Sequence, residues 1–223
     1  MSSRLIALIP AYNEAARIGD VIARTRAHVD EVVVIDDGSV DDTAMVAEKA
    51  GAKVLRHKQN LGKGVAIATA LDCFRHSDAE FAILLDADGQ HDPAEINKFV
   101  EAARIENADI VVGTRMNDVR DMPRVRLWTN QFTSWVTGKL ARQKIPDSQC
   151  GYRLVRRTVL EDLKFSTARF ETETEMLVQA ARAGHKITNV PIRTIYERGH
   201  SSHIHPVRDT IRFFQFVRKY WNA

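Results

Sequence analysis

The stretch FAILLDADGQHDP, residues 81–93, decides the fold class and indicates where the functional site lies. Its first five residues are apolar and end abruptly at Asp86, the pattern of a buried strand followed by a turn. Asp86 and Asp88 would then lie at the carboxyl end of that strand, where open α/β sheets place their ligands. Two neighbouring carboxylates repel each other unless a cation lies between them, and their oxygen atoms suit Mg²⁺ or Mn²⁺. A metal held by so few protein ligands takes others from phosphate, so the stretch indicates an enzyme of nucleoside diphosphates.

The same acids also have a purely structural interpretation. Asp86 and Asp88 could cap the turn before a helix that starts near Pro93, because proline in the first helical turn with acids before it is ordinary capping chemistry. A second acidic cluster follows another apolar run and begins at Asp36. Two such clusters at strand ends favour the functional interpretation.

Apolar runs and helical patterns alternate through the first half of the chain, which predicts βαβ units and a mainly parallel sheet. Strands are expected at 5–9, 31–35, 53–56, 81–85 and 109–113, with helices at 13–22, 41–50, 63–74 and 93–105 between them. This rhythm breaks after residue 113. Helices are then expected at 127–140, 159–163, 171–183 and 209–221, a strand at 187–195, and loops at 147–153 and 199–205. We therefore expect an α/β protein with a C-terminal helical elaboration.

The composition fits one globular domain spanning residues 1–223, because 44% of the residues are hydrophobic. The 32 Lys and Arg residues nearly balance the 29 Asp and Glu residues, for a net charge of +3, and we expect no nucleic-acid partner. Two cysteines in unlike contexts, Cys73 and Cys150, favour a reducing compartment over a disulfide framework. No apolar run approaches the roughly 20 residues of a membrane span, and only 5–9 is apolar near the N-terminus. These features predict a cytoplasmic protein, soluble or peripheral.

Three further motifs are expected at strand ends. IPAYNE, residues 9–14, leaves the first strand, and VVVIDDGSVDDT, residues 32–43, contains Asp37, which could accept hydrogen bonds from a ribose or a base. NLGKGVA, residues 60–66, is a glycine-containing loop in which Lys63 enters a helix. The Walker A spacing of glycines and the following Ser or Thr is missing there, so Lys63 does not indicate a P-loop. Asp41 and Asp42 are better explained as helix caps.

Taken together and in this order, IPAYNE, DDGSVDDT, NLGKGVA and LLDADGQ resemble the family 2 glycosyltransferases, which have the GT-A fold. VVGTRM, residues 111–116, and DSQCGYRLVRR, residues 147–157, are similar to the polyprenyl-phosphate sugar synthases within that group. The resemblance covers nearly the whole chain. It implies a nucleotide-sugar-binding half at 1–115, an acceptor-side half at 116–223, and Mg²⁺ or Mn²⁺ as cofactor.

The resemblance also implies a role for individual residues. Asp86, Asp88 and Gln90 would form the metal-diphosphate shell, with Asp88 the principal ligand. Arg115 would reach the transferred sugar phosphate or the acceptor phosphate. The residues implied to bind the nucleotide sugar are Pro10, Tyr12, Glu14, Asp37, Lys63, Asp86 and Ala87, and those implied to hold the acceptor phosphate are Arg115, Arg126, Asn130 and His203. Asn130 stands where related synthases have a serine, and His203 stands near an expected lysine. Asp88, Arg115 and Arg126 are the implied catalytic residues.

The implied reaction is the inverting transfer of a hexose from GDP-mannose or UDP-glucose to a polyprenyl phosphate. A lipid monophosphate has a second pKa of about 6, so it is already anionic at neutral pH and needs no catalytic base. A hydroxyl acceptor, the main alternative, would need a carboxylate to take its proton, for which Glu171 is a candidate.

Two other classes remain open from the sequence. LLDADGQ also resembles the nucleophile motif of haloacid-dehalogenase phosphatases, although that family expects Thr or Val where Gln90 stands. A nucleotide- or membrane-binding module without activity is the other. The amphipathic stretch 209–221 carries aromatic residues beside basic ones, so it either lies on a membrane surface or packs on the sheet as core.

Overall fold

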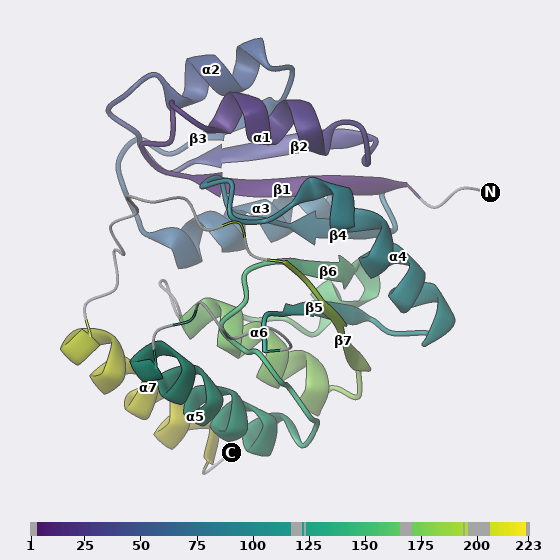
Figure 1. The fold of residues 1–223 in the computed structure, drawn as a ribbon, viewed down its shortest axis with the longest axis vertical. Helices are drawn as coiled ribbons and strands as arrows, with labels where there is room; N and C mark the ends of the chain where they lie inside the picture. The colour runs from purple at the N-terminus through teal and green to yellow at the C-terminus, as the bar shows by residue number, and fades with distance from the viewer. Residues whose placement is uncertain are drawn as a thin grey trace.

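A seven-stranded sheet with the order β3-β2-β1-β4-β6-β5-β7 forms the centre of the molecule (Figure 1). The computed structural model describes residues 4–116, 122, 124–165, 171–193, 195 and 206–221, apart from the side chains of residues 126, 206–212 and 214. The strands are β1 (Leu5–Ala11), β2 (Glu31–Asp36), β3 (Lys53–Arg56), β4 (Phe81–Leu84), β5 (Ile110–Thr114), β6 (Arg153–Arg156) and β7 (Ile187–Pro191).

Helices cover both faces of this sheet. They are α1 (Ile18–Thr25), α2 (Thr43–Lys49), α3 (Lys63–Arg75), α4 (Ile96–Ile105), α5 (Arg124–Ala141), α6 (Glu171–Arg182) and α7 (Pro206–Trp221), with short 3-10 turns at Pro93–Glu95 and Arg157–Glu161. In Figure 1, α1, α2 and α4 lie on one face and α3 and α6 on the other. Helices α5 and α7 pack against α6 and against each other. The structure thus confirms the α/β sheet with helices added on its C-terminal side.

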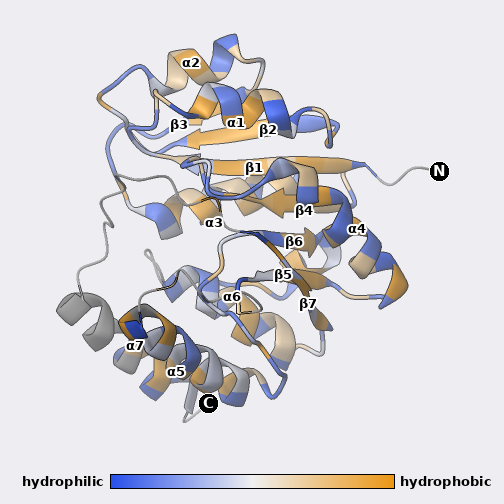
Figure 2. Cartoon of the chain, viewed as in Figure 1, coloured by the Kyte–Doolittle hydropathy of each residue, from blue (hydrophilic) through white to orange (hydrophobic). Residues whose placement is uncertain are grey.

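The sheet is mainly parallel, and the sequence predicted five of its strands closely. Strands β1, β2, β3 and β4 run parallel to one another, and β7 runs parallel to β5. All four residues of β4 are buried, as expected for a strand covered on both faces. Figure 2 shows the central strands as the most hydrophobic part of the molecule.

Strand β6 was not predicted, and the expected loop at 147–153 ends where it begins. It runs antiparallel to both β4 and β5, with Leu154 opposite Ile83 and Val111. Four residues with basic ends are too short to show a strand pattern in the sequence, and the two neighbouring strands supply the burial that stabilises it. The expected helix at 159–163 is instead the 3-10 turn Arg157–Glu161, and the expected strand 187–195 ends at Pro191.

The first helix begins at Ile18, later than the expected 13 or 14. Asn13 has a φ of 56°, in the left-handed region that asparagine tolerates but a helix does not. Its backbone N–H donates to Ser39 Oγ at 2.9 Å, and its side-chain Oδ1 accepts from the Val40 N–H at 2.9 Å. The exit of β1 is therefore tied to the loop after β2 before the helix starts.

Helix α7 supplies two side chains to the hydrophobic core. Phe216 and Tyr220 are buried, and Phe213 and Val217 are partly buried against the same core. This packing favours the core interpretation of 209–221 for these four residues, whereas Trp221 is exposed. Among the described residues, no helix combines the length and the apolar character needed to cross a membrane.

We predict that Tyr220→Phe lowers the free energy of unfolding by about 1–3 kcal/mol, the cost of leaving a buried hydrogen-bonding group without its partner. The Tyr220 hydroxyl donates to Oε1 of the buried Glu175 at 2.8 Å and accepts from Gln179 Nε2 at 2.8 Å. Urea unfolding measures the difference. Trp221→Phe, at the neighbouring exposed position, is the control and should stay within about 0.5 kcal/mol of the parent. Equal effects of the two variants would contradict this account of how α7 is held.

Candidate active site

The acidic motifs meet at the carboxyl ends of β1, β2 and β4. Strand β1 pairs in parallel with both β2 and β4, so the motifs that follow these strands lie on the same edge of the sheet. Because β6 is antiparallel to β4, its first residue, Arg153, lies opposite Leu84 at that edge. Open α/β sheets bind ligands at this edge. The structure thus brings the polar residues predicted from separate motifs into one region.

Lys63 lies between two carboxylates at this edge. Its Nζ is 2.7 Å from Asp86 Oδ1 and 3.6 Å from Glu173 Oε2. Burial would lower the pKa of Lys63, but the charges of Asp86 and Glu173 outweigh it and raise that pKa. Burial would likewise raise the pKa of Asp86, yet Lys63 and other cationic neighbours hold it at about 2. Asp86 is therefore a permanent anion at neutral pH.

Glu173 was not singled out by the sequence analysis, which named Glu171 of the same Glu-Thr-Glu-Thr-Glu run as a candidate base for a hydroxyl acceptor. Both lie in the first turn of α6, where acids are also favoured by the helix dipole. The sequence pattern alone does not distinguish the two acids. Glu173 is the acid of this run that the structure places beside Lys63 and Asp86.

Gly151 lies against the two acids. A Cβ at this position would lie 3.0 Å from Asp86 Oδ2 and 3.2 Å from Glu173 Oε1, closer than side-chain contacts normally allow. Glycine at this position therefore allows the loop to approach both carboxylates closely. Their oxygen atoms are the donor set that Mg²⁺ and Mn²⁺ prefer.

Asp88 adds a third carboxylate in the turn after β4. Its Oδ1 accepts a hydrogen bond from the Gln90 backbone N–H at 2.9 Å. Burial and the negative charge of Asp86 raise the pKa of Asp88. The charge of Asp86 repels that of Asp88, and a divalent cation would offset this repulsion. Cations near these acids include Lys63, Arg115 and Arg153. Within the described part of the chain, no three His, Cys, Asp or Glu side chains converge on one point. A cation held here would therefore complete its shell with other ligands.

A buried aromatic stack packs against the turn that contains Asp86 and Asp88. The Asp86 N–H donates to His91 Nδ1 at 3.1 Å, and the His91 ring stacks on Tyr152 with centroids 4.8 Å apart. Burial lowers the pKa of His91, consistent with a neutral ring that accepts at Nδ1. The Tyr152 hydroxyl donates to the Asp92 carbonyl at 3.0 Å, fixing the far end of the turn.

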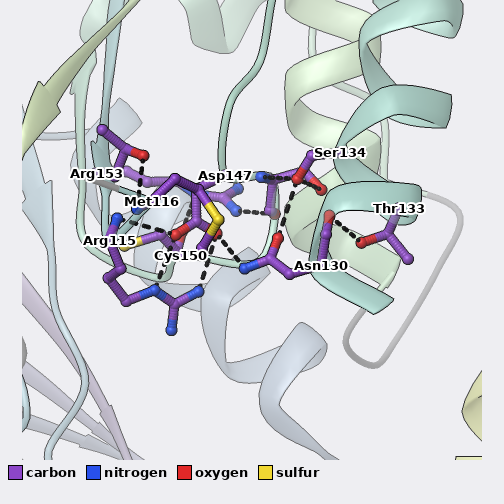
Figure 3. A network of polar contacts seen from close by, with 10 residues as sticks. Arg115, Met116, Asn130, Thr133, Ser134, Asp147, Cys150 and Arg153 are labelled. Atoms are coloured by element: carbon purple, nitrogen blue, oxygen red, sulfur yellow. Dashed lines mark hydrogen bonds and ion pairs between the residues drawn. The ribbon is translucent and has the colours of Figure 1, made fainter. Parts of the chain in front are cut away.

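Arg115 is paired with a buried acid. Its Nε and Nη2 donate to Asp147 Oδ2 and Oδ1 at 2.8 and 2.9 Å, and its backbone N–H donates to Oδ2 at 3.2 Å (Figure 3). Asn130 Nδ2 donates to Asp147 Oδ1 at 2.9 Å, and Ser134 Oγ donates to Asn130 Oδ1 at 3.0 Å. Burial would raise the pKa of Asp147, but the bonds from Arg115 outweigh it and lower that pKa. The network orients Arg115, and Asn130 is buried within it.

Arg153 is a second buried cation and holds the loop that carries Gly151. Its three donor nitrogens reach the carbonyl oxygens of Cys150, Ser148 and Glu173 at 2.7, 2.8 and 2.5 Å. Arg153 is 1% exposed. Arg153 therefore links this loop to the start of α6. The positions of Gly151 and Glu173 depend on these hydrogen bonds.

Asp37, directly after β2, holds the loop that precedes α3. Its carboxylate accepts from His57 Nδ1 at 2.7 Å and from the backbone N–H groups of Leu61 and Gly62 at 3.0 and 2.8 Å. This loop passes so close that a Cβ on Gly38, whose φ is 72°, would lie 2.4 Å from Gln59 backbone. The structure thus places Asp37 in contact with the loop that delivers Lys63, and its contact with a base or ribose stays a prediction.

The other expected residues lie at the same edge or outside the described part of the structure. Tyr12 is exposed and Pro10 half-buried at the end of β1, while Glu14 pairs with Arg17 at 3.3 Å. The side chain of Ala87 is buried, so a ligand would contact the backbone of this residue. The side chain of Arg126 and all of His203 lie outside the described residues.

A nucleotide-handling GT-A enzyme is the class of protein that this fold and this acidic edge define. The family model "Glycosyl transferase family 2" matches residues 6–164, and the chain therefore belongs to that family. This membership makes the protein a glycosyltransferase and sets aside both the phosphatase and the bare binding module.

Individual relatives agree with this assignment. The chain is 32% identical over 220 residues to the UDP-N-acetylglucosamine–dolichyl-phosphate N-acetylglucosaminyltransferase of Methanococcus voltae, covering 88% of each chain. It is 35% identical over 218 residues to the glycosyltransferase AglJ of Haloferax volcanii, covering 95% of this chain and 70% of AglJ. The crystal structure of glucosyl-3-phosphoglycerate synthase from Mycobacterium tuberculosis with Mn²⁺, UDP and phosphoglyceric acid matches with a TM-score of 0.70. That match has 20% identity and covers 99% of this chain and 78% of the synthase, so it establishes the shared fold.

We predict that Arg115→Ala destabilises the protein by about 3–5 kcal/mol, because Asp147 would stay buried without its cation. Removing the charge as well, in Arg115→Ala with Asp147→Asn, should recover a large part of that loss. Urea unfolding of the two variants measures the difference. A double variant no more stable than the single one would show that the ion pair does not determine the stability of this network.

We further predict that Gly151→Ala weakens Mn²⁺-dependent binding of a nucleoside diphosphate by roughly tenfold, by displacing Asp86 and Glu173. Gly138→Ala on α5 is the control, because its Cβ would lie equally close, at 3.0 Å, to the Gln143 carbonyl oxygen, and Gln143 contacts Ile187 at the start of β7, the opposite edge of the sheet. Calorimetric titration measures both affinities. Unchanged binding in the Gly151 variant would show that the positions of Asp86 and Glu173 do not determine the affinity for the ligand.

Proposed function

We propose that this glycosyltransferase is metal-dependent and transfers a hexose from GDP-mannose or UDP-glucose to a polyprenyl phosphate, with inversion. The observation that carries the proposal is the acidic turn after β4 at the carboxyl edge of the sheet, where Lys63 pairs with Asp86 and Glu173 and Asp88 lies two residues beyond Asp86. The name of the Methanococcus voltae relative, a dolichyl-phosphate transferase, supports the lipid phosphate acceptor.

Asp86 and Asp88, with Gln90 in the same turn, would hold Mg²⁺ or Mn²⁺. The bound ion supplies positive charge to the departing nucleoside diphosphate. The carboxylate oxygens of the two aspartates are the donor set that such an ion prefers. Lys63 keeps Asp86 ionised and holds its Oδ1, which restricts the orientation of this carboxylate.

Basic side chains of the protein would bind the phosphate of the acceptor. Arg115 is oriented by Asp147 and Asn130, and a guanidinium held in this way can bind phosphate without further ordering. Arg126 and His203 stay predictions for the same phosphate. A phosphate acceptor is already anionic at neutral pH, so the transfer needs orientation and charge stabilisation more than a base.

A hydroxyl acceptor is the second candidate, and Glu173 is the observation that favours it. A carboxylate beside the metal-binding turn is where a general base for a hydroxyl would be needed. Glu173 lies 3.6 Å from Lys63 Nζ, which also contacts Asp86. In this alternative Glu173 takes the place expected for Glu171.

Turnover with two kinds of acceptor tests the proposal. The protein would be incubated with Mn²⁺ and labelled GDP-mannose or UDP-glucose, with either a polyprenyl phosphate or a saccharide. We expect label that extracts with the lipid, and no transfer when a chelator is present. Label found on the saccharide alone would overturn the lipid acceptor, and full turnover in saturating chelator would overturn the metal.

We predict that Asp88→Asn lowers turnover by about 100-fold or more and removes metal-dependent nucleoside diphosphate binding. The amide keeps the shape of the side chain but loses the charge that the metal needs. Asp72→Asn is the matched control, because Asp72 is an exposed acid on α3 and should leave both properties unchanged. Circular dichroism verifies that both variants keep the fold. Metal-dependent binding of parental strength in Asp88→Asn would contradict the assignment of Asp88 as a ligand.

A further inference from the structure

Helix α5 exposes a stripe of large apolar side chains. Its members, called here the α5 stripe, are Val125, Trp128, Phe132 and Trp135, which are 80%, 73%, 49% and 60% exposed. Their spacing of three, four and three residues places them on one side of the helix. Phe132 and Trp135 contact each other with ring centroids 6.5 Å apart. Contiguous aromatic residues facing water mark an interaction surface.

The opposite side of α5 belongs to the interior. Asn130, Thr133, Ser134 and Thr137 are buried there, and Asn130 and Ser134 join the network that orients Arg115 (Figure 3). The α5 stripe therefore lies on the outer side of the same helix that supports the candidate acceptor site. Whatever binds the stripe is held close to that site.

The charges around the α5 stripe are positive. Helix α5 contains Arg124, Arg126 and Lys139 and has no acidic residue. Exposed Arg142 and Lys144 follow it in the chain. Arg182 donates to the carbonyl oxygens of both Leu140 and Tyr220, which brings the C-terminal end of α7, with its exposed residues Arg218, Lys219 and Trp221, near the C-terminal end of α5. Tryptophan is favoured at the boundary between lipid and water, and nearby cations are attracted to anionic headgroups.

We propose that the α5 stripe binds the surface of an anionic membrane, with α5 lying along the interface and Trp128 and Trp135 among the headgroups. This proposal rests on the proposed function in one respect, that a polyprenyl phosphate acceptor is presented at such a surface. The sequence suggested the C-terminal stretch as a membrane-binding segment, but Phe216 and Tyr220 of that stretch are buried, and the exposed aromatic residues lie on α5 instead. A second copy of the chain fits less well, because two α5 helices facing each other would bring cations together without acids to pair them.

Vesicle flotation tests the proposal with the full chain. The probe is vesicles of phosphatidylcholine, with or without phosphatidylglycerol. We expect binding that needs phosphatidylglycerol and that falls by roughly tenfold or more in the triple variant Trp128→Ala, Phe132→Ala and Trp135→Ala. The control variant Met45→Ala with Ile105→Ala removes two exposed apolar side chains from α2 and α4 and should bind as the parent does. Binding of the triple variant at parental strength would overturn the proposal.

A charge variant and an activity measurement complete the test. Lys139→Glu should weaken binding to phosphatidylglycerol vesicles without altering the stripe, and an unchanged affinity would contradict the cationic contribution. Transfer to a water-soluble, short-chain polyprenyl phosphate should persist in the triple variant, which shows that its site is intact. If the parent binds the vesicles but transfers to no polyprenyl phosphate, the proposed function fails and the membrane surface stands. A concentration-dependent dimer that the triple variant abolishes, without vesicle binding by the parent, would replace the membrane by a second copy.

Discussion

The ion pairs of Lys63 make the acidic edge of the sheet compatible with a folded protein. Asp86 comes from the turn after β4 and Glu173 from the first turn of α6, and these two carboxylates, which both lie against Gly151, would repel each other. Lys63 enters from the start of α3, whose preceding loop is held by Asp37 through two backbone N–H groups. Three separate parts of the chain therefore depend on one ammonium group, and the carboxylate geometry on which metal binding depends follows from it.

Helix α5 joins two properties that a lipid-phosphate transferase needs. Its inner side carries Asn130, which binds Asp147 and so contributes to the orientation of Arg115. Its outer side carries the α5 stripe, which is apolar and bordered by cations. In a rigid helix these two sides are fixed relative to each other, so the orientation of the protein on a surface would also set the orientation of its acceptor site. This combination explains why three aromatic side chains are left in water.

The sequence predicted the strands that bury both faces, because β1, β2, β4 and β5 read as continuous apolar runs before a turn. It also placed Asp86, Asp88 and Lys63 at one edge. It did not predict β6, whose four residues depend on partners supplied by β4 and β5. Nor did it identify Glu173, Gly151 or Asp147, because their roles come from contacts between residues far apart in the chain. The amphipathic pattern of α7 was visible, but its burial depends on α5 and α6, which no local pattern reveals.

The position of a bound metal tests this account most directly. Crystals of the protein grown with Mn²⁺ and a nucleoside diphosphate would be measured at the manganese absorption edge, where anomalous scattering locates the ion independently of the model used for phasing. The account predicts one peak bonded to the Asp88 carboxylate and to the diphosphate, with Lys63 still paired to Asp86. A manganese peak away from Asp88, or a diphosphate bound at this edge with no metal, would contradict it.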